Sequence, residues 1–437
     1  MSVTLCLAAF SLLLALASAR MFRHLSHILV AYYLLWAGIF LVAAWNPLRL
    51  QPVSSNAGWI LAVGLAAAFA GAALVSVSRG KQTAAQRSVI FPASRPRWIV
   101  GLTLASVGLM VAVIAFRDAV SAAAGDIAFS TLSPTEVRYL SVYGSAVHAG
   151  IGTVLFSLAP FVAAGGVIVG RRQRLGYVFT LFALVMSAQS LSRNQVFYTA
   201  LAALLCWVYY RPGGDASGRK GRRRLLQAGA AIVVLAGLLG YFQYTGSLLN
   251  KSAPTQLLVG TTIPEPLVEP TLYITGSPEA LSVAIEDDLQ PTYGEQGRSV
   301  WIVPRLVSLV DPNASVPDTV AAPVPIPYSF NTYTWVGDLW FDFGWAGIVV
   351  GGLFLGAVTV IIDRRARRIG SPLSSWFAAA WGTTLLASVI AFEVFWLQTV
   401  VWLFAGLLIF GSWPTRSYGR GRDHLRTPPP PLPRPPG

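Results

Sequence analysis

Three arginines in this largely apolar chain are candidates for a functional role, because their positive charge needs an explanation. Arg193 lies in the short turn Ser190–Asn194 between two apolar runs, and Arg298 and Arg305 lie in the later segment Tyr293–Arg305. An arginine at membrane depth costs about 2.5–3.5 kcal/mol on insertion scales and usually faces a cavity. Because guanidinium groups bind phosphate through paired hydrogen bonds, one interpretation of these arginines is a phosphate-binding site. The alternatives are lipid-headgroup contact for Arg193 and a solvated or ion-paired loop for the other two.

A second candidate region, Tyr328–Gly347, combines dense aromatic residues with polar side chains. The aromatic density is typical of a membrane–water interface. Asn331, Asp338 and Asp342 do not fit that explanation, because polar groups entering an apolar segment are costly and often functional. With Glu136 from an earlier polar segment, the two aspartates are the acid candidates for a general base, and the sequence does not rank the three.

The sequence offers little for a metal ion or a cofactor. The acidic run Glu286-Asp287-Asp288 fits a solvated helix end better than a cation site. Cys6 and Cys206 lie in apolar runs and give neither a disulfide framework nor a thiol metal site. No Rossmann or Walker glycine pattern occurs in the chain. We therefore expect an activity that uses no metal and no cofactor.

Membrane helices must position these residues. The 437-residue chain is 54% hydrophobic and 11% charged, against roughly 25% charged in a soluble domain, which excludes an ordinary soluble enzyme and a disordered protein. A transmembrane helix needs about 20 mostly apolar residues. We expect an all-α membrane protein with about eleven such helices, the last two separated at Phe392–Val394. They lie near residues 3–19, 27–45, 57–78, 98–116, 147–170, 175–190, 195–210, 225–245, 345–362, 375–391 and 399–413.

The distribution of charge predicts the orientation of these helices. Alternate connections and the C-terminal tail hold 25 of the 32 Lys and Arg residues, and the remaining connections hold 7 of them and 15 of the 18 acids. The positive-inside rule places the first set in the cytoplasm, with the N-terminus outside and the C-terminus inside. The net charge of +14 is then a topology signal rather than a nucleic-acid footprint. Ala17-Ser18-Ala19 also resembles a signal-peptidase site, but Arg20 and Arg23 after it favour a retained helix.

Four regions follow along the chain. Residues 1–245 hold eight of the helices and a short outer loop at 117–146; 246–344 form a large outer loop; 345–413 hold the last three helices; and 414–437 form a disordered Pro/Arg-rich tail. In the first loop, Ser133-Pro134-Thr135-Glu136 predicts a helix start with Ser as the N-cap and Glu at N3. In the second loop, we expect coil through Pro264–Pro266 and a helix start at Gly276-Ser277-Pro278-Glu279. That helix would lie on the membrane surface or against the bundle.

Four short motifs resemble those of the bacterial oligosaccharide repeat-unit polymerases, the Wzy-like O-antigen and exopolysaccharide polymerases. Asn331-Thr332-Tyr333-Thr334 and Asp342-Phe343-Gly344, followed by the small-residue span Gly347–Gly356, are similar to the family signature. The further matches are Tyr293–Pro304, Ser192-Arg193-Asn194 and Arg138. The family often has Ser-Arg-Gly at the second of these, so Asn194 is a departure. The layout of helices with one large late outer loop agrees over most of the chain.

This resemblance implies a GT-C-like membrane glycosyltransferase in the bacterial inner membrane. It would polymerise undecaprenyl-pyrophosphate-linked oligosaccharide units into a surface polysaccharide by transferring the growing chain to the next lipid-linked unit. The residues implied to bind substrate are Arg138, Arg193, Arg298, Arg305, Asn331 and Tyr333. Arginines in a low-dielectric cavity would stabilise the pyrophosphate leaving group without a metal ion.

Two other functions remain compatible with the sequence. An O-antigen-ligase-like transferase would use the same donor and a different acceptor. A lipid-linked glycan flippase would transport the glycan without chemistry, but we see neither the internal repeat nor the mid-membrane charges expected of a transporter. The expected partners are the lipid-linked substrate, membrane lipids and possible chain-length or assembly proteins, and no nucleic acid.

Overall fold

The computed structural model describes residues 2–22, 27–77, 95–143, 155–189, 193–210, 229, 236–241, 243–245, 261–287, 299, 324–326, 329–330, 332–390 and 397–411. Most of these residues are helical, which confirms the expected all-α class. The side chains of Arg138 and Arg193 lie outside the description, although their backbone belongs to helices.

Five helices are long and apolar enough to cross a membrane, so the chain is a membrane protein. They are α1 (Val3–Phe22), α2 (Ile28–Trp45), α3 (Ser55–Val77), α4 (Arg95–Ala123) and α15 (Thr334–Ile369). Shorter helices lie where five more crossings were expected: α8 (Leu158–Gly170), α9 (Tyr177–Ala188), α10 (Arg193–Tyr209), α16 (Pro372–Ala387) and α17 (Leu397–Phe410). The helix expected at 225–245 falls mostly outside the described residues.

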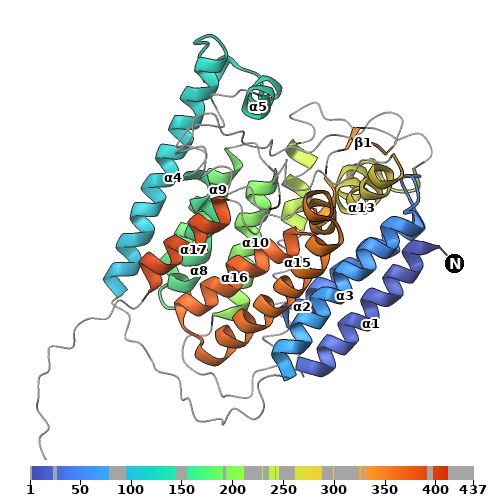
Figure 1. The fold of residues 1–437 in the computed structure, drawn as a ribbon. Helices are drawn as coiled ribbons and strands as arrows, with labels where there is room; N and C mark the ends of the chain where they lie inside the picture. Colours follow the sequence, from blue (N-terminus) through green and yellow to red (C-terminus); the bar gives the residue numbers. More distant parts are fainter. Residues whose placement is uncertain are drawn as a thin grey trace, which may run out of the picture.

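The long helices run roughly along a common direction, with α1–α3 on one side of the bundle and α4 on the other (Figure 1). Beyond the ends of α2 and α4 lie the small elements η1 (Phe129–Thr131), α5 (Pro134–Tyr143) and α13 (Glu265–Glu286). A two-stranded antiparallel sheet pairs β1 (Val324–Pro325) with β2 (Ser329–Phe330), with Val324 opposite Phe330. The turn η2 (Arg174–Gly176) joins α8 to α9 at the opposite end.

Helices α3 and α15 cross most closely, because glycine and alanine line both surfaces. A methyl group at Gly352 would lie 2.7 Å from the Ala67 Cβ and 2.9 Å from the Gly64 carbonyl oxygen. A methyl group at Gly356 would overlap the carbonyl oxygen of Ala68. Small residues let helix backbones approach closely, which is how helices associate in a lipid that supplies no hydrophobic driving force between them.

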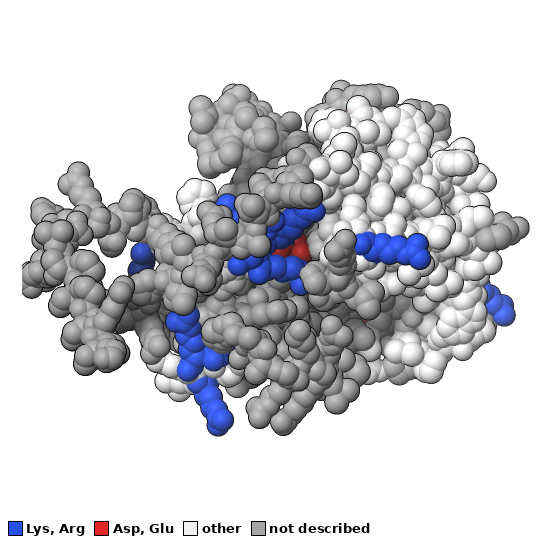
Figure 2. Space-filling model, turned by 90° about the horizontal axis from the view of Figure 1, so that it is seen from below, with Lys and Arg blue, Asp and Glu red and all other residues white. Residues whose placement is uncertain are grey.

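Positive charge gathers at one end of the bundle, which we call the basic face. Its described arginines are Arg20, Arg97, Arg171, Arg172, Arg174, Arg364, Arg365, Arg367 and Arg368. Figure 2 views the molecule from that end and shows basic side chains around a small acidic patch. Most described acids lie at the other end of the bundle, as the charge pattern predicted.

Asp363 is the acid at the basic face within the described part of the chain. It is 1% exposed and accepts hydrogen bonds from Arg367 Nε at 2.7 Å and Tyr209 Oη at 2.6 Å. His27 Nε2 lies 3.2 Å from the same carboxylate, while His27 Nδ1 accepts the backbone N–H of Leu29 and caps α2. The ends of α2, α10 and α15 are therefore joined by one buried polar cluster.

Helix α13 corrects the expectation for the large loop. It begins at Glu265 rather than near Ser277, so Glu265 and Pro266, which were predicted as coil, belong to its first turn. Pro270 and Pro278 both lie inside it, each removing one backbone donor. Burial of Val268, Ala280 and Leu281 favours the continuous helix against that loss. Of the two placements considered for this helix, the structure shows packing against the bundle: α13 touches α2, α3 and α15 and ends at Glu286, where the acidic run begins.

Candidate functional site

The signature segment folds as a broken helix at the start of α15. After Thr334 the backbone is helical from Trp335 to Phe343, leaves the helical region at Gly344 (φ 60°, ψ −144°) and is helical again from Trp345. Only glycine readily adopts such a conformation. The break coincides with the boundary predicted between the large loop and the next membrane helix. We call residues 334–343 the short arm and residues 345–369 the long arm.

The bend at Gly344 is sharp enough to fold the short arm back on the long arm. A methyl group at Gly347 would lie 2.7 Å from the Phe343 Cβ, and one at Gly351 would collide with the side chain of Leu339. In a straight helix Leu339 and Gly351 would be about 18 Å apart along the axis. The short arm therefore lies beside the first turns of the long arm.

The start of the short arm is buried inside the bundle. A methyl group at Gly64 would lie 2.9 Å from Val336 Cγ2 and 3.4 Å from Trp335 Cη2. Gly64 is about 14 Å into α3 at the helical rise of 1.5 Å per residue. Broken helices at such depth are tolerated where they are enclosed by protein or line a cavity, and in transporters they form binding sites.

The chain enters the short arm through a strained residue. Thr334 has a φ of 68°, which is rare for a β-branched side chain, and it is fully buried. Its backbone N–H donates to the Ile390 carbonyl at 3.0 Å, and the Trp335 N–H donates to the Ser388 carbonyl at 2.9 Å. These bonds from the end of α16 hold the strain in place, and such strain tends to occur at functional sites. They also occupy the first donors of the short arm.

Both aspartates of the signature lie on this short arm. Asp338 and Asp342 are 4% and 1% exposed, and their four-residue spacing puts them on one face. Asp342 Oδ2 accepts the backbone N–H of Ser299 at 2.6 Å and also the Ser299 hydroxyl. Ser299 follows Arg298 in the sequence, so the structure joins the two motifs that sequence analysis had treated separately.

The residues before the short arm rest on α13. Thr332 Oγ1 lies 2.9 Å from Ser277 Oγ. Tyr333 is 3% exposed, and its ring packs edge-to-face against Phe341 with the centroids 5.3 Å apart. Tyr333 therefore belongs to the packed interior next to the short arm, and the substrate-binding role that the family resemblance implies for it stays a prediction. Asn331 lies outside the described residues.

Glu136 occupies a different place, on α5. Ser133 N–H and Ser133 Oγ each donate to Glu136 Oε2 at 2.7 Å, and the Glu136 N–H donates to Ser133 Oγ at 3.3 Å. This is the predicted capping box. The two Ser133 donors hold the pKa of the exposed Glu136 carboxyl below its usual value. The Glu136 carboxylate is therefore already occupied by the hydrogen bonds that cap α5.

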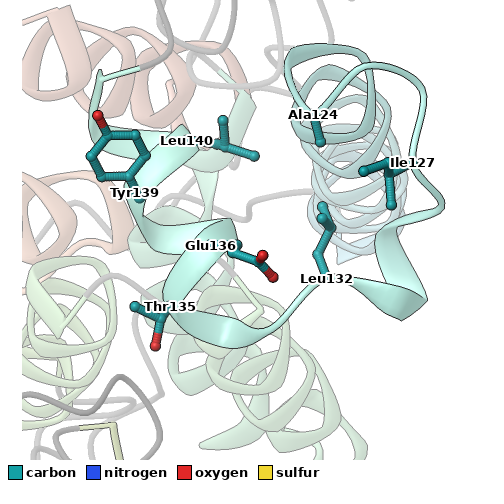
Figure 3. A pocket seen from close by; sticks show the side chains of 7 residues that line it. All are labelled: Ala124, Ile127, Leu132, Thr135, Glu136, Tyr139 and Leu140. Carbon is teal, nitrogen blue, oxygen red and sulfur yellow. The ribbon is translucent and has the colours of Figure 1, made fainter.

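An open, mostly apolar hollow of about 440 Å³ lies beside Glu136 (Figure 3). Its lining side chains come from the connection that follows α4 and from α5. They are Ala124, Ile127, Leu132, Thr135, Glu136, Tyr139 and Leu140. Nearby, Arg117 donates to Gln189 Oε1 at 2.9 Å, and its guanidinium lies 5.3 Å from the centre of the Phe129 ring.

The structure says little about the predicted arginines. Arg193 is the first residue of α10 and Arg138 belongs to α5, but their side chains lie outside the description. Arg298 and Arg305 are outside the described residues altogether. The proposed phosphate contacts of these four arginines therefore stay predictions. In the described part of the chain, no three His, Cys, Asp or Glu side chains gather as a metal site.

Sequence reasoning missed three features of this region. Ser299 was noted only as part of a motif, Thr334 gave no sign of its strained backbone, and Glu279 was interpreted as part of a helix start. In the structure Glu279 is 2% exposed in the interior of α13. The only available signal was an acid placed between apolar residues at helical spacing, with Leu272 before it and Val283 after it.

No protein-family model, curated protein or solved structure matches the chain.

Proposed function

We propose that this protein is a GT-C-like membrane glycosyltransferase with eleven membrane helices that polymerises undecaprenyl-pyrophosphate-linked oligosaccharide units. The observation that carries the proposal is the broken helix: two buried carboxylates, Asp338 and Asp342, lie on a short arm inside the bundle. Ser299 ties that arm to the segment of Arg298. Buried acids at membrane depth are costly and are retained chiefly for function.

In the proposed reaction, a hydroxyl oxygen of the acceptor sugar attacks the anomeric carbon of the donor glycan. The bond between that carbon and the pyrophosphate oxygen breaks, and the lipid pyrophosphate leaves with the electron pair. The hydroxyl proton passes to a carboxylate. Arg138, Arg193, Arg298 and Arg305 are proposed to bind the pyrophosphate, whose growing negative charge they would stabilise.

The three acid candidates differ in their surroundings. Glu136 is exposed and caps α5, which makes it the weakest candidate for a base. Asp342 holds Ser299 through one carboxylate oxygen, so a positioning role suits it. Asp338 lies on the same face of the short arm and is buried with it. We propose Asp338 and Asp342 as a pair, one orienting the loop and the other accepting the proton.

The charge distribution supports an orientation with the basic face in the cytoplasm. The N-terminus and the proposed site are then on the outer side of a bacterial inner membrane, where lipid-linked units are polymerised in the family that the signature resembles. Expected partners are the lipid-linked unit, membrane lipids and proteins that control chain length.

The test is elongation of extracted lipid-linked units by purified protein in detergent with EDTA, without ATP or a nucleotide sugar. We expect a ladder of products, lowered roughly 100-fold or more by Arg193→Ala, since one lost charge-stabilising donor costs about that much. Arg193→Lys should recover only part, because lysine lacks the paired donors. Arg49→Ala is the control, because Arg49 is an exposed arginine on the proposed outer side to which the reaction assigns no role.

Other outcomes distinguish the alternatives. Transfer of the glycan to a different acceptor, with no ladder, would replace the polymerase by a ligase. Movement of labelled lipid-linked glycan across proteoliposome membranes, without product formation under any condition, would replace it by a flippase. Elongation that stops in EDTA and returns with a divalent ion would contradict the metal-independent reaction.

A further inference from the structure

Glu279 is a buried acid to which the proposed reaction assigns no role. Its side chain is 2% exposed, and its Oε2 atom has no hydrogen-bond partner among the described residues. Burial alone raises its pKa to about 9, so the carboxyl keeps its proton at neutral pH. An isolated carboxylate in such a place would be very costly.

The helix that carries Glu279 contributes several residues, its neighbour Ala280 among them, to an apolar cluster. Helix α13 shares its hydrophobic cluster with Leu48 and Leu50 from the α2–α3 connection and with Val324 and Ile326. Charged and titratable groups do occur on α13 and on the neighbouring parts of the elements packed against it. They are Tyr32 and Tyr33 on α2, Arg49 in the connection, Tyr333, Asp338 and Asp342 around the short arm, and Glu265, Glu269, Tyr273, Glu286 and Asp287 of α13. None of these groups contributes to the raised pKa of Glu279, which has burial as its cause.

The residues around Glu279 on α13 hold the signature segment in place. Ser277 contacts Thr332 through the hydroxyl pair at 2.9 Å. A methyl group at Gly337 in the short arm would lie 3.2 Å from Leu281 Cδ1. On another side of the helix, Ser282 Oγ accepts the backbone N–H of Ser54 at 2.7 Å. A movement of α13 would therefore disturb the entry to the short arm.

We infer that Glu279 is a proton switch. While its carboxyl is neutral, α13 packs against the short arm, and loss of the proton displaces α13 from that buried position. The predicted pH dependence of protein stability does not depend on the transferase activity. Regulation of polymer formation by the same switch rests on the proposed function.

The sign of the pH effect follows from linkage. Below about pH 4.5 Glu279 is protonated in both the folded and the unfolded chain, and its contribution to stability is complete. Between there and about pH 9 the unfolded chain loses the proton while the folded chain keeps it. In that window the group lowers the folding equilibrium constant by about tenfold per pH unit. Stability is thus lost as the pH rises.

The first test is the thermal unfolding midpoint of the full-length protein in detergent from pH 5.5 to 8.5. Glu279→Gln removes the proton equilibrium and keeps the size of the side chain. We expect its midpoint to fall less steeply with pH than that of the unchanged protein, so that the gap widens at high pH. Glu265→Gln is the control, because Glu265 is exposed in the first turn of the same helix. Parallel curves for Glu279→Gln and the unchanged protein would overturn the switch.

A second test does not require the glutamine variant to fold. In a Cys6→Ser background, Ala280→Cys puts a thiol at a position that is fully buried on α13. Its labelling rate, divided by that of Leu267→Cys at an exposed position of the same helix, should rise with pH when Glu279 is present. A ratio that does not change with pH would show that α13 stays seated and would overturn the proposal. Neither test measures polymer, so a failed transferase assay leaves both outcomes readable.

Discussion

Gly344 sets the direction of the short arm. Its replacement by alanine tests whether that direction determines activity, independently of the stability of the whole protein. At φ 60° and ψ −144° a residue with a Cβ is strained by about 1–3 kcal/mol. The chain can relieve that strain only by changing the angle between the arms. The contact of Leu339 with Gly351 would then be lost, and Asp338 and Asp342 would move with the arm.

Gly370→Ala is the matched control for this change. Gly370 also has a positive φ, 59°, and a methyl group there would have no neighbour within 4 Å. It ends the same helix at the basic face, far from the short arm. Its replacement should cost about 1–2 kcal/mol of left-handed strain, so the two variants should lose similar stability.

The assay is polymer formed per amount of folded protein, with folding measured by size-exclusion chromatography and the thermal unfolding midpoint. A displacement of about 1 Å in a reacting group can cost roughly 100-fold in rate. We therefore expect Gly344→Ala to lose at least tenfold in activity per folded protein, while Gly370→Ala keeps its activity. Equal activity in the two variants would refute the argument that the bend positions the carboxylates.

Two further predictions concern packing and topology. Gly356→Ala should destabilise the protein by about 1–3 kcal/mol, because its methyl group would lie 2.7 Å from the Ala68 carbonyl carbon and 2.9 Å from the Ala72 nitrogen. Gly38→Ala in α2 is the control and should be neutral or stabilising, because a methyl group there has no neighbour within 4 Å. Thermal unfolding measures both variants, and equal midpoints would contradict the tight crossing of α3 and α15. For the orientation, an impermeant thiol reagent added to intact cells should label Tyr139→Cys and not Leu175→Cys, both in a Cys6→Ser background. These exposed residues lie at opposite ends of the bundle. The reverse labelling pattern would show that the membrane orientation is opposite to the one proposed.

Local sequence patterns predicted local structure well. The capping box at Ser133 and Glu136 formed as expected, because its partners are three residues apart and depend on nothing else. The division of the last apolar run also holds, since α16 ends at Ala387 and α17 begins at Leu397. The bilayer thickness limits the length of a single membrane helix, and this limit can be applied to the sequence alone.

Features that depend on distant contacts could not be predicted. Pro278 suggested a helix start, but the apolar cluster around α13 favours a helix that continues through it. The burial of Glu279 could not be predicted, because the apolar cluster of α13 includes the α2–α3 connection and the small sheet, which are remote along the chain. The bond between Ser299 and Asp342 joins a loop to a helix, and neither partner has a local pattern that announces it.

The motif that resembles the polymerase signature drew attention to the short arm but did not predict its shape. Residues up to 344 were assigned to the large outer loop, and the next membrane helix was expected from residue 345. The strained backbone at Thr334 is held by hydrogen bonds from Thr334 and Trp335 to the carbonyl groups of Ile390 and Ser388, which lie later in the chain than the signature. No periodicity within the signature encodes those partners.

The close crossing of α3 and α15 has a consequence for how the protein is made. The two surfaces belong to segments ending at Val77 and Ile369, and a ribosome adding 5–20 residues per second needs on the order of 15–60 s to synthesise the chain between them. Throughout that interval α3 must wait in the bilayer with its partner surface unfilled. A face of glycine and alanine suits the delay, because lipid tails can cover it without leaving any polar side chain unsatisfied, and the arriving α15 has only to displace lipid.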